Sequence, residues 1–424
     1  MSNRLVTRSR LLLWGGCLGL AFALPLVFKS GFLISLLCQM GIMVVFSLSY
    51  NMLLGQTGLL SFGHAVYYGL GAFATMHALN AIGKDGGPLV VALLPAVGAC
   101  AGLAGGVLLG YVTTRKAGTT FAMITLGIGE LVAACSLMFP GVFGGEGGIS
   151  GNRVIGKESV LGFNWGPQVE MYGLIVMWAF VCTVAMFALT QTPLGRMANA
   201  VRDNPERAEF VGYDTERVRL LMVILSGMFA GAAGGLTALN YEIVTAETLN
   251  AHTSGVVLLM TFVGGIGFFY GPIIGAILIT VMQIVVGGMT HAWLLYFGLF
   301  FLFMVLKAPG GIASLIAVQR NLWNAGLFGR MLPHYLAMML PVLILLAGLV
   351  GVVELGYALL AGDGVGAGDT ATRVLGMQLK LGTPAPWVTA LAVTGAGMIL
   401  TRWIGGRAGA AWNSTLATLH GDKP

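Results

Sequence analysis

Apolar residues occur along the chain in long runs, and short polar stretches separate these runs. Several runs reach roughly the 20 residues with which an α-helix crosses the hydrocarbon core of a bilayer. A membrane β-barrel would instead show short segments of alternating hydrophobicity. The pattern therefore predicts up to twelve helical spans, at approximately residues 11–28, 31–53, 58–80, 88–113, 118–139, 169–189, 218–239, 254–270, 272–288, 291–306, 333–361 and 386–402.

Two parts of this pattern depart from simple spans. Residues 58–80 and 254–288 are rich in glycine and are joined to their neighbours by very short links. Non-helical backbone within a bilayer is tolerated only where protein or a water-filled cavity surrounds it. We expect that either part can contain a re-entrant or broken segment. The fold class is an all-α, polytopic integral membrane protein with roughly 10–12 transmembrane helices.

Composition agrees with this fold class. Of the 424 residues, 57% are hydrophobic and only 9% are charged, whereas a soluble domain carries about 25% charged residues. The five cysteines lie within apolar runs, and the sequence contains neither a Cys-x-x-Cys pair nor a cluster of histidines. We therefore expect no disulfide, no metal site, no cofactor and no nucleic-acid partner.

The distribution of lysine and arginine predicts the orientation. Three arginines, at positions 4, 8 and 10, precede the first apolar run, which we interpret as a retained span because no clear cleavage site follows it. With this end in the cytoplasm, sixteen of the 22 Lys and Arg residues fall in inside segments. Cytoplasmic loops carry such an excess. Twelve spans then place both termini in the cytoplasm.

A dense charged loop at residues 191–217 interrupts the apolar sequence. Thr192-Pro193 and Asn204-Pro205-Glu206 are both typical of helix starts. Gly212 is placed to end the second helix. We predict two short surface helices, the second from about Pro205 to Val211, with outward charged side chains. The residues expected to contact a partner are Arg202, Glu206, Arg207, Glu209 and Gly212.

A merely solvated loop is the alternative interpretation of this segment. The length of the loop, its caps and its mixed charge favour a docking element. The chain contains no G-x-x-x-x-G-K-[ST] motif, so any ATP-driven movement would have to enter from a separate protein.

Residues 144–151 (GGEGGISG) lie in the predicted external loop. The glycines permit tight, irregular backbone. The loop is either a flexible turn or a vestibule where Gly147 and Gly148 meet a solute or the protein that delivers it.

Three polar residues within predicted spans are candidates for a translocation pathway: Ser61, His64 and Glu130. An unpaired carboxylate in a span is costly, so Glu130 should face other helices or a wet cavity. A buried hydrogen bond between helices is the alternative for Glu130. A structural hydrogen-bond role is likewise the alternative for His64.

The chain divides into three predicted parts. Residues 1–308 form a core that contains the loop at 191–217. Residues 309–332, with apolar positions near helical spacing, suit a linker helix lying in the membrane interface. Residues 333–424 form an extension with two spans, in which Glu354 has Arg or Lys as potential partners.

Four stretches resemble a known family, the membrane subunits of the branched-chain amino acid ABC importers, which also include urea and aromatic-acid permeases. They occur in family order over about residues 30–312, with residues 144–151 as a looser fifth match. The four stretches are 51–65 (NMLLGQTGLLSFGHA, running on to 69–72), 125–130 (TLGIGE), 200–212 (AVRDNPERAEFVG) and 264–267 (GGIG, followed by 271–276, GPIIGA). Residues 313–424 extend beyond the usual end of the family.

The resemblance implies a function. The chain would be a permease subunit in a bacterial inner membrane, itself not an enzyme and without a catalytic residue. Its partners would be cytosolic ATP-binding cassette subunits, a second homologous permease, a periplasmic solute-binding protein and membrane lipid. The solute would be a branched-chain amino acid or a related small amphiphile.

Two other functions compete with this one. A self-contained secondary transporter or channel, for example for urea, would need coupling-ion carboxylates and matching broken helices in two halves. We find no convincing internal repeat, and only Glu130 and Glu354 qualify as such carboxylates. A membrane enzyme would need clustered His, Asp or Cys at one membrane face, and the six scattered histidines do not provide it.

Overall fold

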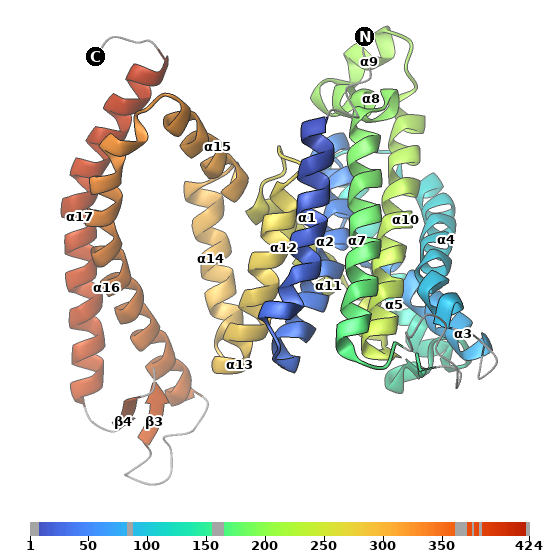
Figure 1. Ribbon diagram of the computed structural model, residues 1–424, viewed down its shortest axis with the longest axis horizontal. Coiled ribbons are helices and arrows are strands. Elements are labelled where there is room, and N and C mark those ends of the chain that lie inside the picture. The colour runs from blue at the N-terminus through green and yellow to red at the C-terminus, as the bar shows by residue number, and fades with distance from the viewer. Residues whose placement is uncertain are drawn as a thin grey trace. The chain divides into compact units, whose positions relative to one another are not determined.

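The computed structural model describes residues 8–82, 88–154, 165–360, 371–374, 377–380 and 384–420. Each of the twelve predicted segments contains a helix, so the all-α polytopic fold is confirmed (Figure 1). The long helices are α1 (Arg8–Val27), α2 (Gly31–Thr57), α3 (Ala65–Ile82), α4 (Pro88–Thr113), α5 (Thr119–Met138), α7 (Gln168–Gln191), α10 (Thr215–Tyr241), α11 (Ala251–Gly264), α12 (Gly271–Val281), α14 (Trp293–Lys307), α15 (Gly311–Asn324), α16 (Phe328–Leu360) and α17 (Pro384–His420).

Short elements connect these helices. They are α6 (Pro140–Phe143), η2 (Gly145–Gly147), β1 (Ile149–Ser150), α8 (Pro193–Asp203), α9 (Pro205–Phe210), β2 (Ile243–Val244), η3 (Ala246–Leu249), the π-helix η4 (Met282–Val286), α13 (Gly287–Met289), β3 (Ala371–Val374) and β4 (Met377–Lys380). Strands β1 and β2 pair antiparallel, as do β3 and β4.

Helix length and hydropathy indicate which described helices can cross a bilayer. Among the described residues, 8 helices are long and apolar enough to cross a membrane, or up to 9 if the bent pair α14 and α15 is one span. Helix α11 has only 14 residues, and α3 begins only after the non-helical residues 58–64. Residues 58–80 and 254–288, which the sequence predicted to be irregular, therefore each contain a break in the helix.

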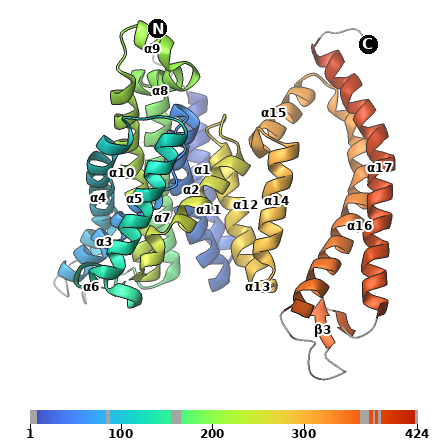
Figure 2. The same cartoon turned by 180° about the vertical axis from the view of Figure 1, so that it is seen from behind.

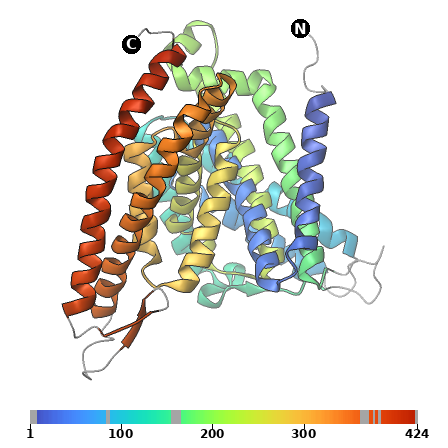
Figure 3. The same cartoon turned by 60° about the vertical axis from the view of Figure 1, so that its left-hand side comes forward.

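The chain forms two compact units. The first comprises residues 1–284 and 301–314, and the second comprises residues 285–300 and 315–424. In the first unit, the start of α1 lies at the same end as α8 and α9 (Figure 3), and α6 lies at the opposite end (Figure 2). The first span and the charged loop therefore share a side, as the distribution of arginine and lysine predicted.

Helix α10 lies in the core of the first unit, and most of its residues are buried. Its glycines let neighbouring backbones approach closely. A Cβ added at Gly231 would lie 2.2 Å from the carbonyl oxygen of Gly98 on α4, and one at Gly234 would lie 1.8 Å from the carbonyl oxygen of Tyr68 on α3. Larger side chains at these positions would separate the three helices.

Helices α11 and α12 form a tight hairpin in the same unit. A Cβ at Gly275 would lie 1.8 Å from the carbonyl oxygen of Met260, and one at Gly264 would lie 2.0 Å from that of Gly271. Helix α11 has only 14 residues, about 21 Å at 1.5 Å per residue. The glycine motif of residues 264–276 is thus the turn and contact surface of a helical hairpin.

Helices α16 and α17 of the second unit lie side by side (Figure 1). Small residues allow their close contact. A Cβ at Gly348 would lie 2.5 Å from the backbone nitrogen of Thr394. Glu354 does not pair with Arg or Lys in the described part of this unit. Its Oε1 accepts hydrogen bonds from the hydroxyls of Thr290 at 2.7 Å and Tyr296 at 2.8 Å.

Helix α15 begins at Gly311, four residues after α14 ends at Lys307, and the two helices are bent by 48°. It contributes a helix within the predicted linker at 309–332. Its position at a membrane interface stays a prediction.

Candidate functional site

Residues 58–64 form an extended segment between α2 and α3. Gly58 has φ 69°, a left-handed conformation that ends α2 and that glycine adopts without steric cost. Three side chains from other elements satisfy the backbone of this segment and of the residue after it. The Tyr50 hydroxyl donates to the carbonyl of Ser61 at 2.9 Å, the Phe62 N–H donates to Thr125 Oγ1 at 3.2 Å, and the Ala65 N–H donates to Ser254 Oγ at 2.9 Å.

These bonds give the motif at residues 51–65 a physical explanation. An extended segment within an apolar body has unpaired backbone groups, and each must find a partner inside the protein. Helices α2, α5 and α11 supply those partners. The segment is therefore held rigidly by residues that are far apart in the sequence.

His64 and Ser61 are buried at this segment, at 0% and 1% exposure. His64 Nε2 lies 3.0 Å from Ser49 Oγ, and the imidazole stacks on Phe46 with ring centroids 5.6 Å apart. Its Nδ1 has no partner among the described residues. Neither residue lines the two cavities described below, so the structure places both within the packed core.

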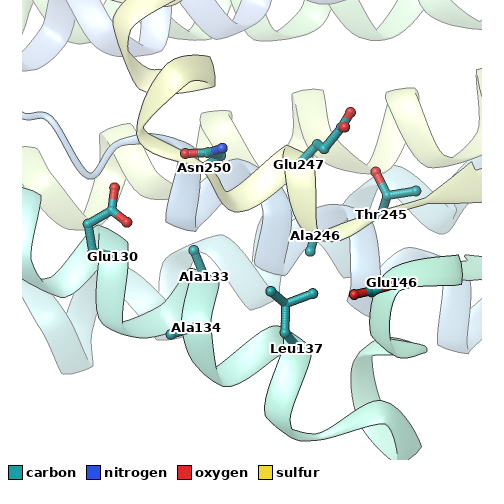
Figure 4. A pocket seen from close by; sticks show the side chains of 9 residues that line it. All are labelled: Glu130, Ala133, Ala134, Leu137, Glu146, Thr245, Ala246, Glu247 and Asn250. Atoms are coloured by element: carbon teal, nitrogen blue, oxygen red, sulfur yellow. The ribbon is translucent and has the colours of Figure 1, made fainter.

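A cavity of about 560 Å³ lies between α5 and the loops at one end of the first unit (Figure 4). Glu130 and Leu137 project into it from α5, opposite the segment that carries Asn250 (Figure 4). The lining residues are Glu130, Ala133, Ala134, Leu137, Glu146, Thr245, Ala246, Glu247 and Asn250. Three carboxylates therefore share a cavity whose remaining wall is mostly small and aliphatic.

A second cavity, of about 420 Å³, borders the other half of α5. Its lining residues are Gly58, Leu60, Phe62, Gly118, Thr119, Ala122, Met123 and Leu126. The extended segment forms one wall, and the start of α5 forms another. Helix α5 thus presents a polar cavity towards the end with α6 and an apolar cavity towards the end with α8.

Glu130 lies within the span Thr119–Met138 and is exposed in the single chain. A charged side chain facing lipid costs several kcal/mol. The neighbouring Met123 and Leu131 are also exposed, at 74% and 62%. This face of α5 therefore requires water or another protein chain beside Glu130.

The glycine-rich loop is compact up to residue 154, and residues 155–164 lie outside the described part. Ile149 and Ser150 pair with Val244 and Ile243. Gly148 has φ 70°, and a Cβ there would lie 2.2 Å from the carbonyl oxygen of Val244. Gly147 is exposed and open on its Cβ side. Both glycines directly follow Glu146, in the tight turn that places Glu146 at the wall of the polar cavity.

Arg153 is a residue whose role the sequence did not reveal. It is 6% exposed, and its guanidinium donates to the carbonyls of Leu239, Asn240 and Trp165 at 3.0, 2.9 and 2.7 Å. Carbonyls at a helix C-terminus lack partners and favour a nearby cation. Arg153 therefore joins the glycine-rich loop to the end of α10. Its position in an outside segment, against the general bias of Arg and Lys, is the signal that could have indicated this role.

The predicted pair of short helices in the charged loop is confirmed as α8 and α9. The Gly195 N–H donates to Thr192 Oγ1 at 3.4 Å, and the Arg207 N–H donates to Asn204 Oδ1 at 2.9 Å. Gly212 has φ 94° just after the second helix. Side-chain caps and proline at the first helical position thus define both helices.

The charged side chains of this loop are exposed, and two of them also bond to neighbouring helices. Glu206 and Arg207 are exposed, and Phe210 is 91% exposed. Glu209 Oε1 accepts from the Thr215 hydroxyl at 2.7 Å and so braces the start of α10. Arg202 is exposed as expected, with 36% of its side chain accessible, and its guanidinium also donates to the carbonyl of Gly55 on α2. A cation beside the unpaired carbonyls of a helix end is favourable, which explains this contact.

The fold defines a multi-pass, α-helical membrane protein whose α5 face carries two cavities. A sequence model of the family described as "Branched-chain amino acid transport system / permease component" matches residues 32–309. The chain belongs to this family of transport permeases.

Individual relatives agree with the family and differ in cargo. The chain is 27% identical over 311 residues to the high-affinity branched-chain amino acid transport system permease protein LivM of Escherichia coli (strain K12), covering 68% of this chain and 72% of LivM. It is 27% identical to the fructose import permease protein FrcC of Rhizobium meliloti, covering 45% of this chain and 55% of FrcC. It is 28% identical to the autoinducer 2 import system permease protein LsrC of Enterobacter sp. (strain 638), covering 61% of this chain and 69% of LsrC. No solved structure shows a significant match.

Proposed function

We propose that this chain is a transmembrane subunit of an ATP-driven ABC importer and that α8 and α9 dock on its cytosolic ATPase subunits. The observation that carries the proposal is the pair of capped, charged helices at one end of an otherwise apolar body (Figure 1). The chain has no phosphate-binding motif of its own. Family membership supports the transport role.

The surface of α9 fits a protein partner. Phe210 and Val211 are 91% and 69% exposed, next to the exposed Glu206 and Arg207. An exposed aromatic side chain surrounded by charges is typical of the centre of a protein interface. The aromatic ring would fill a pocket of the ATPase, and the charges would fix its orientation.

A second permease subunit would cover the exposed face of α5. Glu130 cannot face lipid at low cost, and the same face exposes Met123 and Leu131. Two such faces together would enclose a pathway that joins the polar and apolar cavities. The chain would then be one of a pair of permeases in a bacterial inner membrane, with α8 and α9 in the cytoplasm.

The polar cavity favours a branched-chain amino acid as the solute. Glu130, Glu146 and Glu247 attract an ammonium group, while Ala133 and Leu137 suit an aliphatic side chain. A sugar site usually offers an aromatic face for stacking, but none of the described residues that line this cavity is aromatic. Delivery by a periplasmic solute-binding protein would supply the affinity that such an open cavity lacks.

The docking proposal is tested by purifying the tagged chain from its native membranes and identifying the bound subunits. We expect an ATP-binding cassette subunit to co-purify with the wild-type chain. The double variant Arg207→Glu, Phe210→Ser should lose it while still inserting into the membrane. Glu216→Arg, a charge reversal in the first turn of α10, is the matched control and should retain it. Retained ATPase binding and full leucine uptake in the double variant would contradict the proposal.

A further inference from the structure

The C-terminal end of α2 is held between two distant parts of the chain. On one side, the Arg202 guanidinium donates to the Gly55 carbonyl, and its aliphatic stem packs on Gly58, where an added Cβ would lie 3.0 Å from Arg202 Cγ. On the other side, a Cβ at Gly55 would lie 2.9 Å from the carbonyl oxygen of Ile266. The motifs at 51–65, 200–212 and 264–267 therefore meet at Gly55.

Arg202 is itself held in place by its neighbour. Its Nε donates to Asp203 Oδ1 at 2.9 Å, and its Nη2 lies 2.9 Å from the same oxygen. The planar guanidinium presents several donors in a fixed geometry, so one edge can bind Asp203 while Nη1 reaches Gly55. Arg202 therefore joins α8 to α2 as a fixed bracket rather than as a loose surface charge.

The contact of Arg202 with Gly55 and Gly58 lies a few residues before the part of the chain that lines the apolar cavity. Leu60 and Phe62 line that cavity, two and four residues after Gly58. The Phe62 N–H is bonded to Thr125 on α5. A displacement of the end of α2 must therefore change the position of Leu60, Phe62 or both.

We propose that Arg202 is the positioning residue that passes movement of α8 to the extended segment at residues 58–62. Arg202 acts inwards, on Gly55 and Gly58, and the outward residues of α9 contact the ATPase. The proposal rests on the proposed function, in which the ATPase moves α8 and α9. It assigns separate tasks to two parts of the charged loop: α9 binds the partner, and Arg202 transmits the displacement.

The test measures the reactivity of a single cysteine at position 60 in inside-out membrane vesicles. The five native cysteines are first replaced by alanine, and Leu60→Cys is labelled with N-ethylmaleimide. In Arg202→Gln the labelling rate should change about tenfold, the factor expected for one charge-assisted hydrogen bond. Arg202→Lys keeps the positive charge but loses the planar guanidinium with its several donors, so it should give an intermediate labelling rate. Arg217→Gln is the matched control, because Arg217 is 83% exposed and pairs with Asp214 near its own helix start.

The first arm of the experiment requires neither ATP nor solute. Equal labelling rates in Arg202→Gln and in the parent protein would overturn the proposed link. Arg202→Lys keeps the proposal testable if Arg202→Gln does not accumulate in the membrane.

The second arm repeats the labelling on the intact complex with ATP and vanadate. ATP should change the rate in the parent protein and in Arg217→Gln but not in Arg202→Gln. An ATP response that persists in Arg202→Gln overturns the link. Absence of an ATP response in the parent protein contradicts the proposed function instead, which separates the two failures.

Discussion

The backbone N–H of Phe62 donates a hydrogen bond to the side-chain oxygen of Thr125, 3.2 Å away on α5. This bond joins the extended segment to the helix that borders both cavities. Thr125 is buried and also donates to the carbonyl of Ala122 at 2.9 Å. One hydroxyl thus satisfies a non-helical N–H group that is partly buried.

Thr125→Val removes the hydroxyl and preserves the shape of the side chain. The partly buried Phe62 N–H would then lose its partner, which costs about 1 kcal/mol. We expect a lower Tm for the purified protein in detergent, measured by the fluorescence of a thiol-reactive dye. Thr125→Ser keeps the acceptor and should lie closer to wild type, and an unchanged Tm in Thr125→Val would refute this role.

The hairpin of α11 and α12 should not tolerate a methyl group at Gly275. The added Cβ would lie 1.8 Å from the Met260 carbonyl oxygen, so the helices must separate. We expect Gly275→Ala to destabilise the protein by more than about 2 kcal/mol, within the range of severe packing defects. Gly255→Ala on α11, where no atom lies within 4 Å of the added Cβ, is the control and should be neutral or stabilising. Equal amounts of folded protein by size-exclusion chromatography for both variants would contradict this packing.

Arg153→Gln should loosen the glycine-rich loop. The substitution leaves carbonyls of α10 without their cationic donor, at a cost of about 1–3 kcal/mol. We expect faster cleavage of the loop by a protease added from the outside, together with reduced solute uptake. Arg153→Lys should restore only part of the protection, because a single ammonium group cannot reach all the carbonyls that the guanidinium binds. Wild-type cleavage rates in Arg153→Gln would show that the loop is held by other contacts.

The carboxylates of the polar cavity should determine preference for an ammonium group. Glu130→Gln removes one negative charge, and we expect the KM for leucine uptake to rise about tenfold, the factor for one charge-assisted hydrogen bond. Glu247→Gln should act in the same direction. Glu216→Gln removes an exposed carboxylate at the start of α10, outside the cavity, and serves as the control. Unchanged leucine uptake in both cavity variants, or faster uptake of galactose than of leucine, would point to a different solute.

Local sequence signals predicted the helices well, because long apolar runs and side-chain caps act over a few neighbouring residues. The caps at Thr192 and Asn204 correctly placed α8 and α9. Hydropathy does not distinguish the extended segment at residues 58–64 from the helix that follows it, so the predicted span at residues 58–80 included both.

The candidate site was less accessible to sequence reasoning. Arg202 was predicted as an outward charge and is exposed, but its bond to the carbonyl of Gly55, 147 residues earlier, could not be read from the sequence. The position of His64 depends on the hydroxyl of Ser49 and the ring of Phe46. Such contacts arise only when helices from distant parts of the chain pack together. For Glu130 the sequence predicted other helices or a wet cavity, because the cost of a carboxylate in a span depends on the residue itself, and Glu130 lines a cavity of the single chain.

The most direct test of the central claim is solute uptake by the purified complex in proteoliposomes. The complex, prepared with its co-purifying subunits and binding protein, is supplied with radiolabelled leucine. We predict uptake that requires ATP on the side of α8 and α9 and that is abolished by Arg207→Glu, Phe210→Ser. Uptake driven by a proton or sodium gradient in the absence of ATP would contradict this account and would indicate a self-contained transporter.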